Sequence, residues 1–512
     1  MSDHTLSTAI PSVQRLPAVT SLLLSARSLL TIVFLGTIFT VAARPITDPD
    51  FWWHLKTGQY IVTTSSIPHM DIFSAFHFGK EWVTHEWLSE VFIYGTFHFL
   101  GYAGLTIVFA LVVTAAFAVV HQRCSRNGEH IYVSGFALML GSIATVPTWG
   151  VRPQMFSILF ASLFLKVLDG YTQKGRTRGL WWLLPLMVLW VNTHAGFALG
   201  VSLILFTIVG LVLEGFLSRD QQANSAWQRT RPLFLVLAAC LAVVAINPNA
   251  LRIYSYPLET VKSHGMMKYI SEWWSPDFHQ LMFQPFAFLI LATFAAMALS
   301  PKRVSLKDLF LLLVTGWAAL RSARNIPFFA LVAAPLLAEH LWNWLKHGKW
   351  VNFSQPSQEG MPAHPWPKIA VNIALLVLAP SVLALARVSH TVETQPKITA
   401  EHFPVAAVEF IRNNKPSQPL YNEYGWGGYL IWTLSPDYRV YIDGRADVYG
   451  DGFLEEFLNT HDGEPGWRET LDRTGVKTVL IQPDAALASL LRLDPTWRNI
   501  YEDQRAIIFT RP

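Results

Sequence analysis

The stretch LLTIVFLGTIFTVAARPITDPDFWWHL, residues 29–55, joins a long apolar run directly to a short acidic and aromatic string. Residues 29–43 carry no charge, which is typical of a helix that crosses a bilayer. The string DPDFWWH, residues 48–54, follows where such a helix would leave the hydrocarbon. Carboxylates and an imidazole beside tryptophans that anchor at a membrane interface indicate chemistry on a lipid-borne substrate.

The composition of the whole chain is that of a membrane protein. Of its 512 residues 52% are hydrophobic and only 14% are charged, which is far more apolar than a soluble domain. We count about eleven apolar runs of membrane-spanning length. They lie at about 23–43, 101–120, 131–147, 153–168, 180–191, 196–217, 232–246, 284–300, 306–320, 326–345 and 368–388. We therefore predict a polytopic α-helical protein of the cell (inner) membrane.

The orientation follows from basic residues, which gather in alternate connections between the runs. They are Arg123, Arg126, Lys174, Arg176, Arg178, Arg219, Arg229, Arg231, Lys302, Arg303, Lys307, Lys346, Lys349 and Lys368. The positive-inside rule places these connections and residues 1–22 in the cytoplasm, and an odd number of spans then puts the C-terminus outside. The net charge of +4 comes mostly from this bias, so it is no evidence for nucleic-acid binding.

The chain changes character after residue 397, where charge density rises and apolar runs shorten to the length of strands. The pattern predicts helices at 405–412, 455–460, 467–473 and 485–491, and strands at 439–442, 477–481 and near Ile500 and Ile507. About 115 residues can bury a core of their own. We therefore predict a membrane domain at 23–390, with outer loops at about 44–88 and 247–283, and an extracytoplasmic α/β domain at 398–512.

Ionisable residues are nearly absent from the apolar runs, and polar side chains gather at the outer ends of these runs. They are Asp48, Asp50, His54, Arg152, Asn192, His194, Asn247, Asn249, Arg252, Arg321, Arg324 and Asn325. A charge inside the bilayer is expensive, and a proton-coupled transporter usually needs one near the midplane. The pattern instead indicates a site at one membrane face, with both anionic and cationic members.

This division of charges is suited to the transfer of a group from a lipid phosphate. A carboxylate can accept the proton of an attacking hydroxyl. Arginines can neutralise the charge that grows on the leaving phosphate. Because nucleotide sugars are absent outside the cytoplasm, a polyprenyl-phosphate sugar is the expected donor.

Four motifs carry a resemblance to the GT-C class of membrane glycosyltransferases. They are DPDFWWHLKTGQYI (48–61), HEWLSE (85–90), VRPQMFSI (151–158) and YIDGRADVYG (441–450). More narrowly, the motifs resemble a bacterial set of predicted GT-C proteins that has no assigned substrate. The resemblance implies many spans, a soluble outer domain and a catalytic acid in the first outer loop.

The acid that the resemblance identifies as the catalytic base is Asp48 or Asp50. Pro49 separates the two, where a consecutive acidic pair is usual. We assign Asp50 as the base and Asp48 as its partner, because the aromatic segment follows Asp50 directly. The alternative is that residues 48–49 start a turn and that Trp52 and Trp53 only anchor at the interface.

Support at the site is expected from His54, His85 and Glu86. Together with Asp50 these side chains are also candidates for binding a divalent metal. Their spacing is irregular, however, and acid–base or hydrogen-bonding roles are commoner. No other cofactor is expected.

Four arginines are assigned to the phosphate of the donor: Arg152, Arg252, Arg321 and Arg324. Arg321 and Arg324 lie one turn apart if their segment is helical, which would present both to one ligand. A structural pair is the alternative for them, and a snorkelling end residue is the alternative for Arg152. Asn192 and His194 fit a helix cap better than a binding site.

Asp443, Arg445 and Asp447 follow a predicted strand. They are candidates for binding the acceptor, and a local salt-bridge cluster is the commoner outcome of such a pattern. We therefore predict a glycosyltransferase that moves a sugar, with inversion, from a polyprenyl-phosphate donor to a glycan, lipid or protein acceptor at the outer face. The alternative is a non-enzymatic lipid-carrier transporter or a membrane assembly factor whose outer domain binds a partner.

Overall fold

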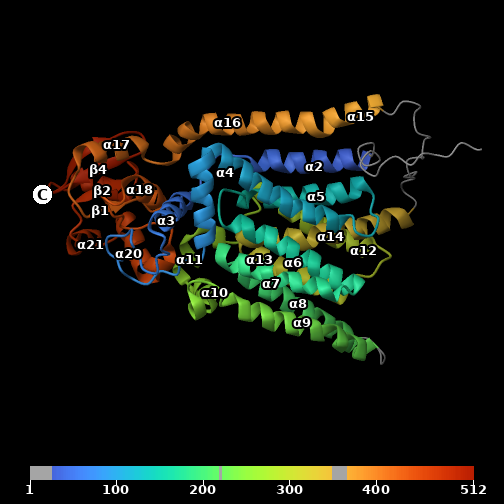
Figure 1. Ribbon diagram of the computed structural model, residues 1–512. Coiled ribbons are helices and arrows are strands. Elements are labelled where there is room, and N and C mark those ends of the chain that lie inside the picture. Colours follow the sequence, from blue (N-terminus) through green and yellow to red (C-terminus); the bar gives the residue numbers. More distant parts are fainter. Residues whose placement is uncertain (1–25, 218–221, 349–365) are drawn as a thin grey trace, which may run out of the picture.

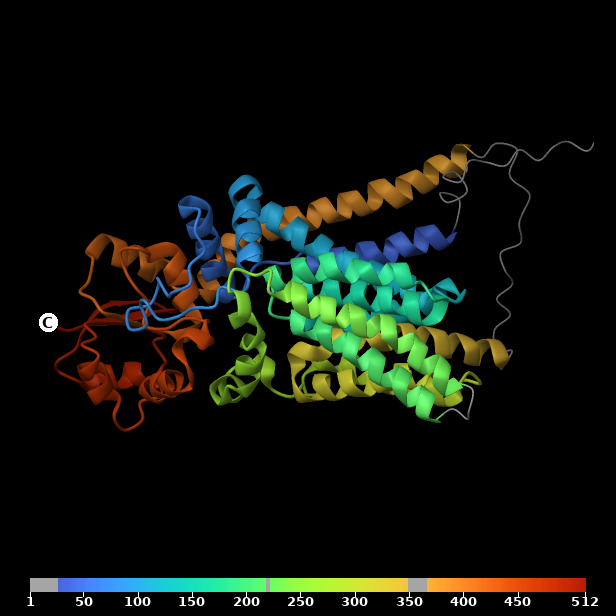
Figure 2. The ribbon, with the colours of Figure 1, turned by 60° about the horizontal axis from the view of Figure 1, so that its bottom comes forward.

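The computed structural model describes residues 26–217, 222–348 and 366–512. Long helices form a bundle, and the C-terminal region lies at one end of this bundle (Figures 1 and 2). The bundle helices are α2 Ala26–Ala42, α4 Trp87–Cys124, α5 Ile131–Thr145, α6 Gln154–Lys174, α7 Leu183–Thr193, α8 Phe197–Leu217, α9 Gln222–Val244, α12 Gln284–Leu299, α13 Leu306–Arg321, α14 Ile326–His347, α15 Trp366–Ile373 and α16 Ala379–His402.

Most of the apolar runs predicted from the sequence coincide with one of these helices. The run at 180–191 starts in a 3-10 helix, Thr177–Trp182, and the run at 368–388 extends over α15, a π-helical segment at Ala374–Leu378 and α16. The first three residues of the run at 23–43 lie outside the described residues. Within the described residues, eight helical segments are long and apolar enough to cross a membrane. The helices α2, α7 and α13 are shorter, with 17, 11 and 16 residues. The polytopic helical membrane fold is therefore confirmed, and the total of eleven spans stays a prediction.

Burial separates a central helix of the bundle from a peripheral one. The segment that contains α14 is 78% buried, and α14 packs on α4, α5, α6, α12 and α13. The segment that contains α16 is only 11% buried, and α16 touches the bundle mainly through α2 and α4. Its exposed side chains include Val382, Leu383 and Leu385, so a bilayer is the solvent that suits the first part of this helix.

The first loop forms a short helix across the end of the bundle. Helix α3, Asp50–Thr64, packs between the first turns of α4 and helix α18 of the C-terminal region. A Cβ atom on Gly58 would overlap the backbone of Glu90, so only glycine permits this close crossing. Trp52 is 2% exposed and lies against Phe403 and Tyr429. The alternative that it anchors at the lipid interface is therefore wrong.

The C-terminal region is built on a four-stranded sheet in the order β1-β2-β4-β3. Strands β1 and β2 are parallel, and the other neighbours are antiparallel. Its elements are α17 Val405–Asn414, β1 Leu420–Asn422, α18 Gly427–Leu434, α19 Ala446–Tyr449, α20 Asp451–His461, α21 Trp467–Arg473, β2 Thr478–Ile481, α22 Ala486–Leu493, β3 Arg498–Glu502 and β4 Ile507–Thr510. Helix α16 leads directly into the region, because it continues through residues 391–397 to His402.

The strand predicted at 439–442 is wrong, and β1 was not predicted. Of residues 439–442, Val440 alone forms a β-bridge, an isolated one to Ser74 of the first loop. The Asn422 side chain instead accepts from the backbone N–H of Tyr441 and donates to the carbonyl of Ile442. A side chain thus satisfies backbone groups that a strand would pair through a ladder.

Candidate active site

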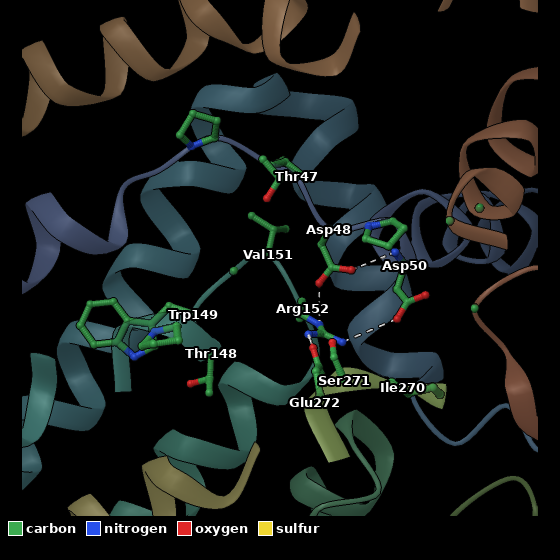
Figure 3. Close-up of a pocket in the computed structure, with 18 of the residues that line it drawn as sticks. Thr47, Asp48, Asp50, Thr148, Trp149, Val151, Arg152, Ile270, Ser271 and Glu272 are labelled. Atoms are coloured by element: carbon green, nitrogen blue, oxygen red, sulfur yellow. Dashed lines mark hydrogen bonds and ion pairs between the residues drawn. The ribbon is translucent and has the colours of Figure 1, made fainter. Parts of the chain in front are cut away.

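The centre of the candidate site is the guanidinium of Arg152, which lies just before α6. It contacts three carboxylates from two other segments of the chain (Figure 3). Its Nε lies 2.6 Å from Asp48, its Nη2 lies 3.6 Å from Asp50, and its Nη1 pairs with Glu272. The structure therefore brings both acids of the first loop and Arg152 together, as the sequence predicts, and adds Glu272.

Local geometry gives the two aspartates different roles. The Asp48 carboxylate accepts the backbone N–H of Asp50 at 2.9 Å, which fixes the first turn of α3. The Asp50 carboxylate accepts from Trp53 Nε1 at 3.1 Å. Burial and the neighbouring charge of Asp48 raise the pKa of Asp50 to about 7, against the opposing effect of Arg152. Burial also raises the pKa of Asp48, although Arg152 and the N–H of Asp50 act to lower it. Asp50, which faces Arg152 at the longer distance, can take up a proton near neutral pH.

Two cavities meet at this cluster. The first cavity, of about 400 Å³, is lined mainly by residues 44–50, 147–152 and 270–272, with Tyr424 and three glycines of the C-terminal region. The second cavity, of about 490 Å³, extends toward α8 and α10 (Tyr256–Lys262). The side chains of Asp50, Arg152, Ile270 and Glu272, together with Gly444, line both cavities.

Three histidine rings lie around the Glu86 carboxylate in the second cavity. His85 lies 2.7 Å from its carboxylate, His54 lies at 3.4 Å and His194 at 3.7 Å. Burial acts to raise the pKa of Glu86, but the neighbouring rings of His85 and His54 hold this pKa well below its usual range. Burial acts to lower the pKa of His85, but the Glu86 carboxylate raises it above its usual value. Burial lowers the pKa of His54 to about 4 and that of His194 to about 3. His85 is therefore the ring whose protonated form Glu86 favours.

In this structure these side chains contact one another and are not directed at a common metal position. The nitrogens and oxygens that a metal would need as ligands contact one another, as in the His85–Glu86 pair. Asp50 and Arg152 are engaged with each other in the same way. In the described parts of the chain, no group of three or more His, Cys, Asp or Glu side chains is arranged around a possible metal position. A metal at this site stays an untested prediction.

Of the four arginines assigned to a phosphate, Arg324 has the most suitable position. It lines the second cavity with its guanidinium 4.3 Å from the centre of the Trp273 ring. Among residues 26–217, 222–348 and 366–512, no carboxylate forms an ion pair with it. Its charge is therefore available to a ligand, whereas Arg152 already faces three carboxylates.

Arg321 and Arg252 lie outside both cavities. Ser322 is extended, with φ −149° and ψ 123°, so α13 ends at Arg321 and the two arginines do not share a helix. The condition for presenting both to one ligand is not met. Arg321 is exposed over Trp317, and Arg252 pairs at the surface with Glu81 and Glu259.

The motif YIDGRAD divides between a structural ion pair and the candidate site. Arg445 pairs with Asp443 at 2.7 Å and with Asp71 of the first loop at 2.8 Å, and both carboxylates are fully buried. For these residues the salt-bridge interpretation is confirmed. Asp447 instead lines the second cavity, where its carboxylate lies 3.4 Å from the Tyr256 hydroxyl.

Glu272, His194 and Gly444 were not assigned to the site from the sequence. Glu272 stands in the string EWWSPD, residues 272–277, which marks an outer loop but gives no partner for it. His194 caps a turn, since its Nδ1 accepts from Gly196, and its other nitrogen faces Glu86. A Cβ atom on Gly444 would overlap the Asp50 carboxylate. Only the tertiary packing reveals these contacts.

Comparison with known proteins rests on solved structures. No protein-family model matches the sequence, and no curated protein matches it. The archaeal oligosaccharyltransferase AglB from Archaeoglobus fulgidus, solved with an inhibitory peptide and a dolichol-phosphate, is similar with a TM-score of 0.55 and 12% identity. The match covers 88% of this chain and 69% of that one.

Two further structures are similar. An oligosaccharyltransferase from the same organism, tethered to an acceptor peptide with the sequon NVT, has a TM-score of 0.54 and 13% identity over 88% of this chain and 68% of that chain. ArnT from Cupriavidus metallidurans, bound to undecaprenyl phosphate, has a TM-score of 0.46 and 13% identity over 94% and 97%. At such identities the oligosaccharyltransferase matches show the fold alone. The chain therefore shares its fold with these two oligosaccharyltransferase structures.

Proposed function

We propose that this protein is a glycosyltransferase that moves a sugar from a polyprenyl-phosphate donor to an acceptor, with Asp50 as the general base. The observation that carries the proposal is the meeting of two cavities at Asp50, Arg152 and Glu272. A donor in one cavity and an acceptor in the other would approach the same carboxylate. The oligosaccharyltransferase of the same fold, with its dolichol-phosphate and peptide, supports this division.

The second cavity suits the lipid phosphate. Its apolar lining includes Leu199, Val261 and Phe328, which can accommodate part of a polyprenyl chain. Arg324 offers a planar cation without an ion-pair partner among the described residues. His85 lines the same cavity, but its ring nitrogens already contact the Glu86 carboxylate and the Val83 carbonyl. Arg324 is therefore the cation that would stabilise the charge that develops on the leaving phosphate.

The first cavity would then hold the acceptor hydroxyl. Asp50 accepts the hydroxyl proton while the acceptor oxygen forms a bond to the anomeric carbon of the sugar. The bond between that carbon and the phosphate oxygen breaks, and the electron pair leaves with the polyprenyl phosphate. Direct displacement inverts the anomeric carbon. Arg152 fixes Asp48 and moderates the basicity of Asp50, so we assign it a positioning role rather than a phosphate contact.

The decisive experiment is a transfer assay with purified protein in detergent and a polyprenyl-phosphate sugar. Asp50→Asn keeps the shape of the side chain and removes proton acceptance, so transfer should fall by about 10²–10⁴-fold while donor binding persists. Asp48→Asn is the matched variant, and we expect a smaller loss from it. Full activity in both variants would refute the enzymatic proposal and favour a lipid-carrier transporter or assembly factor.

The side of the membrane and the donor can be tested in cells. The basic connections favour an orientation with the site at the outer face, where a lipid-linked sugar would be the available donor. Cells that lack the protein should therefore accumulate a polyprenyl-phosphate sugar, and the wild-type chain should reverse the accumulation. Accumulation that the Asp50→Asn chain reverses equally well would contradict the proposed chemistry.

A further inference from the structure

A groove runs along helix α20 in the C-terminal region, apart from the candidate active site. Two cavities form it, of about 600 Å³ and about 290 Å³, and both are lined by Gly452 and Glu456. The larger cavity, which we call the aromatic pocket, lies between α20 and residues 76–80 of the first loop. The smaller cavity, which we call the tryptophan pocket, lies between α20 and Trp467.

Aromatic rings form the walls of this groove. In the aromatic pocket, Phe453 lies at the centre of a cluster, with ring centroids 4.5 Å from His77 and 5.6 Å from Tyr449. Phe453 and Trp467 are both half-buried, so part of each ring faces the groove. Phe453 also stacks on Tyr441, with ring centroids 5.1 Å apart, so the aromatic pocket has a rigid wall. The exposed parts of such rings can pack against the C–H groups of sugars, and these side chains have few rotatable bonds to fix on binding.

The polar groups of the aromatic pocket call for a ligand that both donates and accepts hydrogen bonds. His77 is 4% exposed, and its Nδ1 has no hydrogen-bond partner among the described residues. Burial lowers the pKa of His77, so the ring is neutral at pH 7 and has one acceptor nitrogen. Helix α20 also starts here at Asp451 without a side-chain cap, so its first N–H groups are donors.

A hydroxyl group satisfies both requirements, whereas a carboxylate or a fully ionised phosphate could accept from the donors alone. The Lys80 side chain is exposed at the rim, and the Glu456 carboxylate pairs with Arg473 at 2.5 Å between the two pockets. Uncharged hydroxyls therefore suit the floor, and a balanced pair of charges borders it. This combination of ring faces and paired polar groups is the chemistry that recognises a neutral saccharide.

We propose that the groove binds two consecutive sugar residues of a glycan and that this glycan is the acceptor. The inference rests on the proposed function and deepens it by naming the class of acceptor. The groove adjoins the active site through one buried chain of contacts. Tyr449 lines the aromatic pocket, and its hydroxyl donates to Asp443 at 2.5 Å. Gly444, the next residue, lines both cavities at Asp50.

The test measures saccharide binding to the purified full-length protein in detergent, without any donor. The probes are cellobiose, maltose, mannobiose and N,N′-diacetylchitobiose, observed by saturation-transfer NMR and titrated to obtain the dissociation constant. We expect at least one disaccharide to bind the wild-type chain. Phe453→Ala and Trp467→Ala should each weaken its binding by roughly fivefold, because each removes a stacking face. Trp467→Phe, which keeps a ring, should retain most of the affinity.

The matched control is Phe78→Ala, which removes an exposed ring on the same loop from beneath Arg439, outside both pockets. It should leave binding unchanged. Absence of binding for all probes, or an equal loss in the Phe78→Ala control, would overturn the proposal. Donor binding by the same samples, followed with a polyprenyl-phosphate sugar, tests the proposed function separately, since Arg324 and Asp50 lie in other cavities.

Discussion

At the scale of single residues, Asp50 owes its basicity to a balance of burial and charge. Burial and Asp48 raise its pKa to about 7, and Arg152 lowers it. A base acts only when deprotonated, so kcat/KM for transfer should fall as pH decreases through about 7 and reach a plateau above it. A pH profile of the purified protein measures this. Arg152→Gln should move the falling limb to higher pH, and a profile that is flat across pH 7 would contradict the role of Asp50.

Gly444 is a positioning residue for Asp50. A Cβ atom there would overlap the Asp50 carboxylate and approach Trp53 Nε1, so Gly444→Ala must displace the base from its hydrogen bond. We expect kcat to fall by roughly 10²-fold, because small misplacements of a reacting group are costly. Gly425→Ala is the control, since Gly425 lines the first cavity with open space at its Cβ position. Equal effects from the two alanines would refute the positioning role.

Arg324 is the residue through which donor affinity can be tested. Lysine keeps the charge but loses the planar fork that binds two phosphate oxygens together. Arg324→Lys should therefore raise the KM for a polyprenyl-phosphate sugar moderately, and Arg324→Ala should raise it much more. Arg321→Ala removes an exposed arginine outside both cavities and should have no effect. Similar KM values for all three variants would mean that the phosphate binds elsewhere.

At the scale of helices and strands, the membrane part was predictable from the sequence and the C-terminal region only partly. A bilayer requires long uncharged helices, so each apolar run marks one. The strands β2 and β4 were predictable because each is a short apolar run that is buried in the C-terminal region. Strand β1 has only three residues, which is too short for a clear pattern. Residues 439–442 have a stronger apolar pattern, but their backbone bonds to the Asn422 side chain and does not form a ladder.

The residues of the candidate site were likewise predictable only in part. Asp48, Asp50 and Arg152 border apolar runs, where a charge is informative in itself. Glu272 and Gly444 matter because of contacts with segments far away in the chain, and no local pattern contains that information. Arg321 was overrated because the extended residue Ser322 ends α13 directly after it, so Arg321 and Arg324 do not lie on one helix.

A buried cluster joins three helices at the other end of the bundle. Asp169 of α6 lies 2.9 Å from Arg123 of α4 and 2.6 Å from Arg126, and Arg126 reaches Glu339 of α14 at 3.0 Å. Asp169→Asn leaves Arg123, which is 7% exposed, without its anion, so the free energy of unfolding should fall by about 3–5 kcal/mol. Denaturant unfolding in mild detergent measures this. Glu401→Gln, in an exposed pair with Lys397, should change it little.

At the scale of the whole molecule, the first loop and the C-terminal region must lie on one side of the membrane. The buried pair of Asp71 and Arg445 joins them at 2.8 Å. Reporter fusions after Lys56 and Asp443 should therefore give the same signal, the extracytoplasmic one, and a fusion after Arg178 the cytoplasmic one. A cytoplasmic signal after Asp443 would overturn the orientation and, with it, the argument for a lipid-linked donor.

Gly444 and Asp447 reach the site from near the end of the chain, whereas Asp48 and Asp50 come from near its beginning. A ribosome therefore makes the base of the proposed reaction early and its last neighbours late. With the predicted orientation, Asp50 meets them only after α16 has been inserted and the residues behind it have been translocated. Under the proposed function, a stalled or truncated product holds the acid but not the finished cavities. Such a product leaves the cell's supply of lipid carrier untouched.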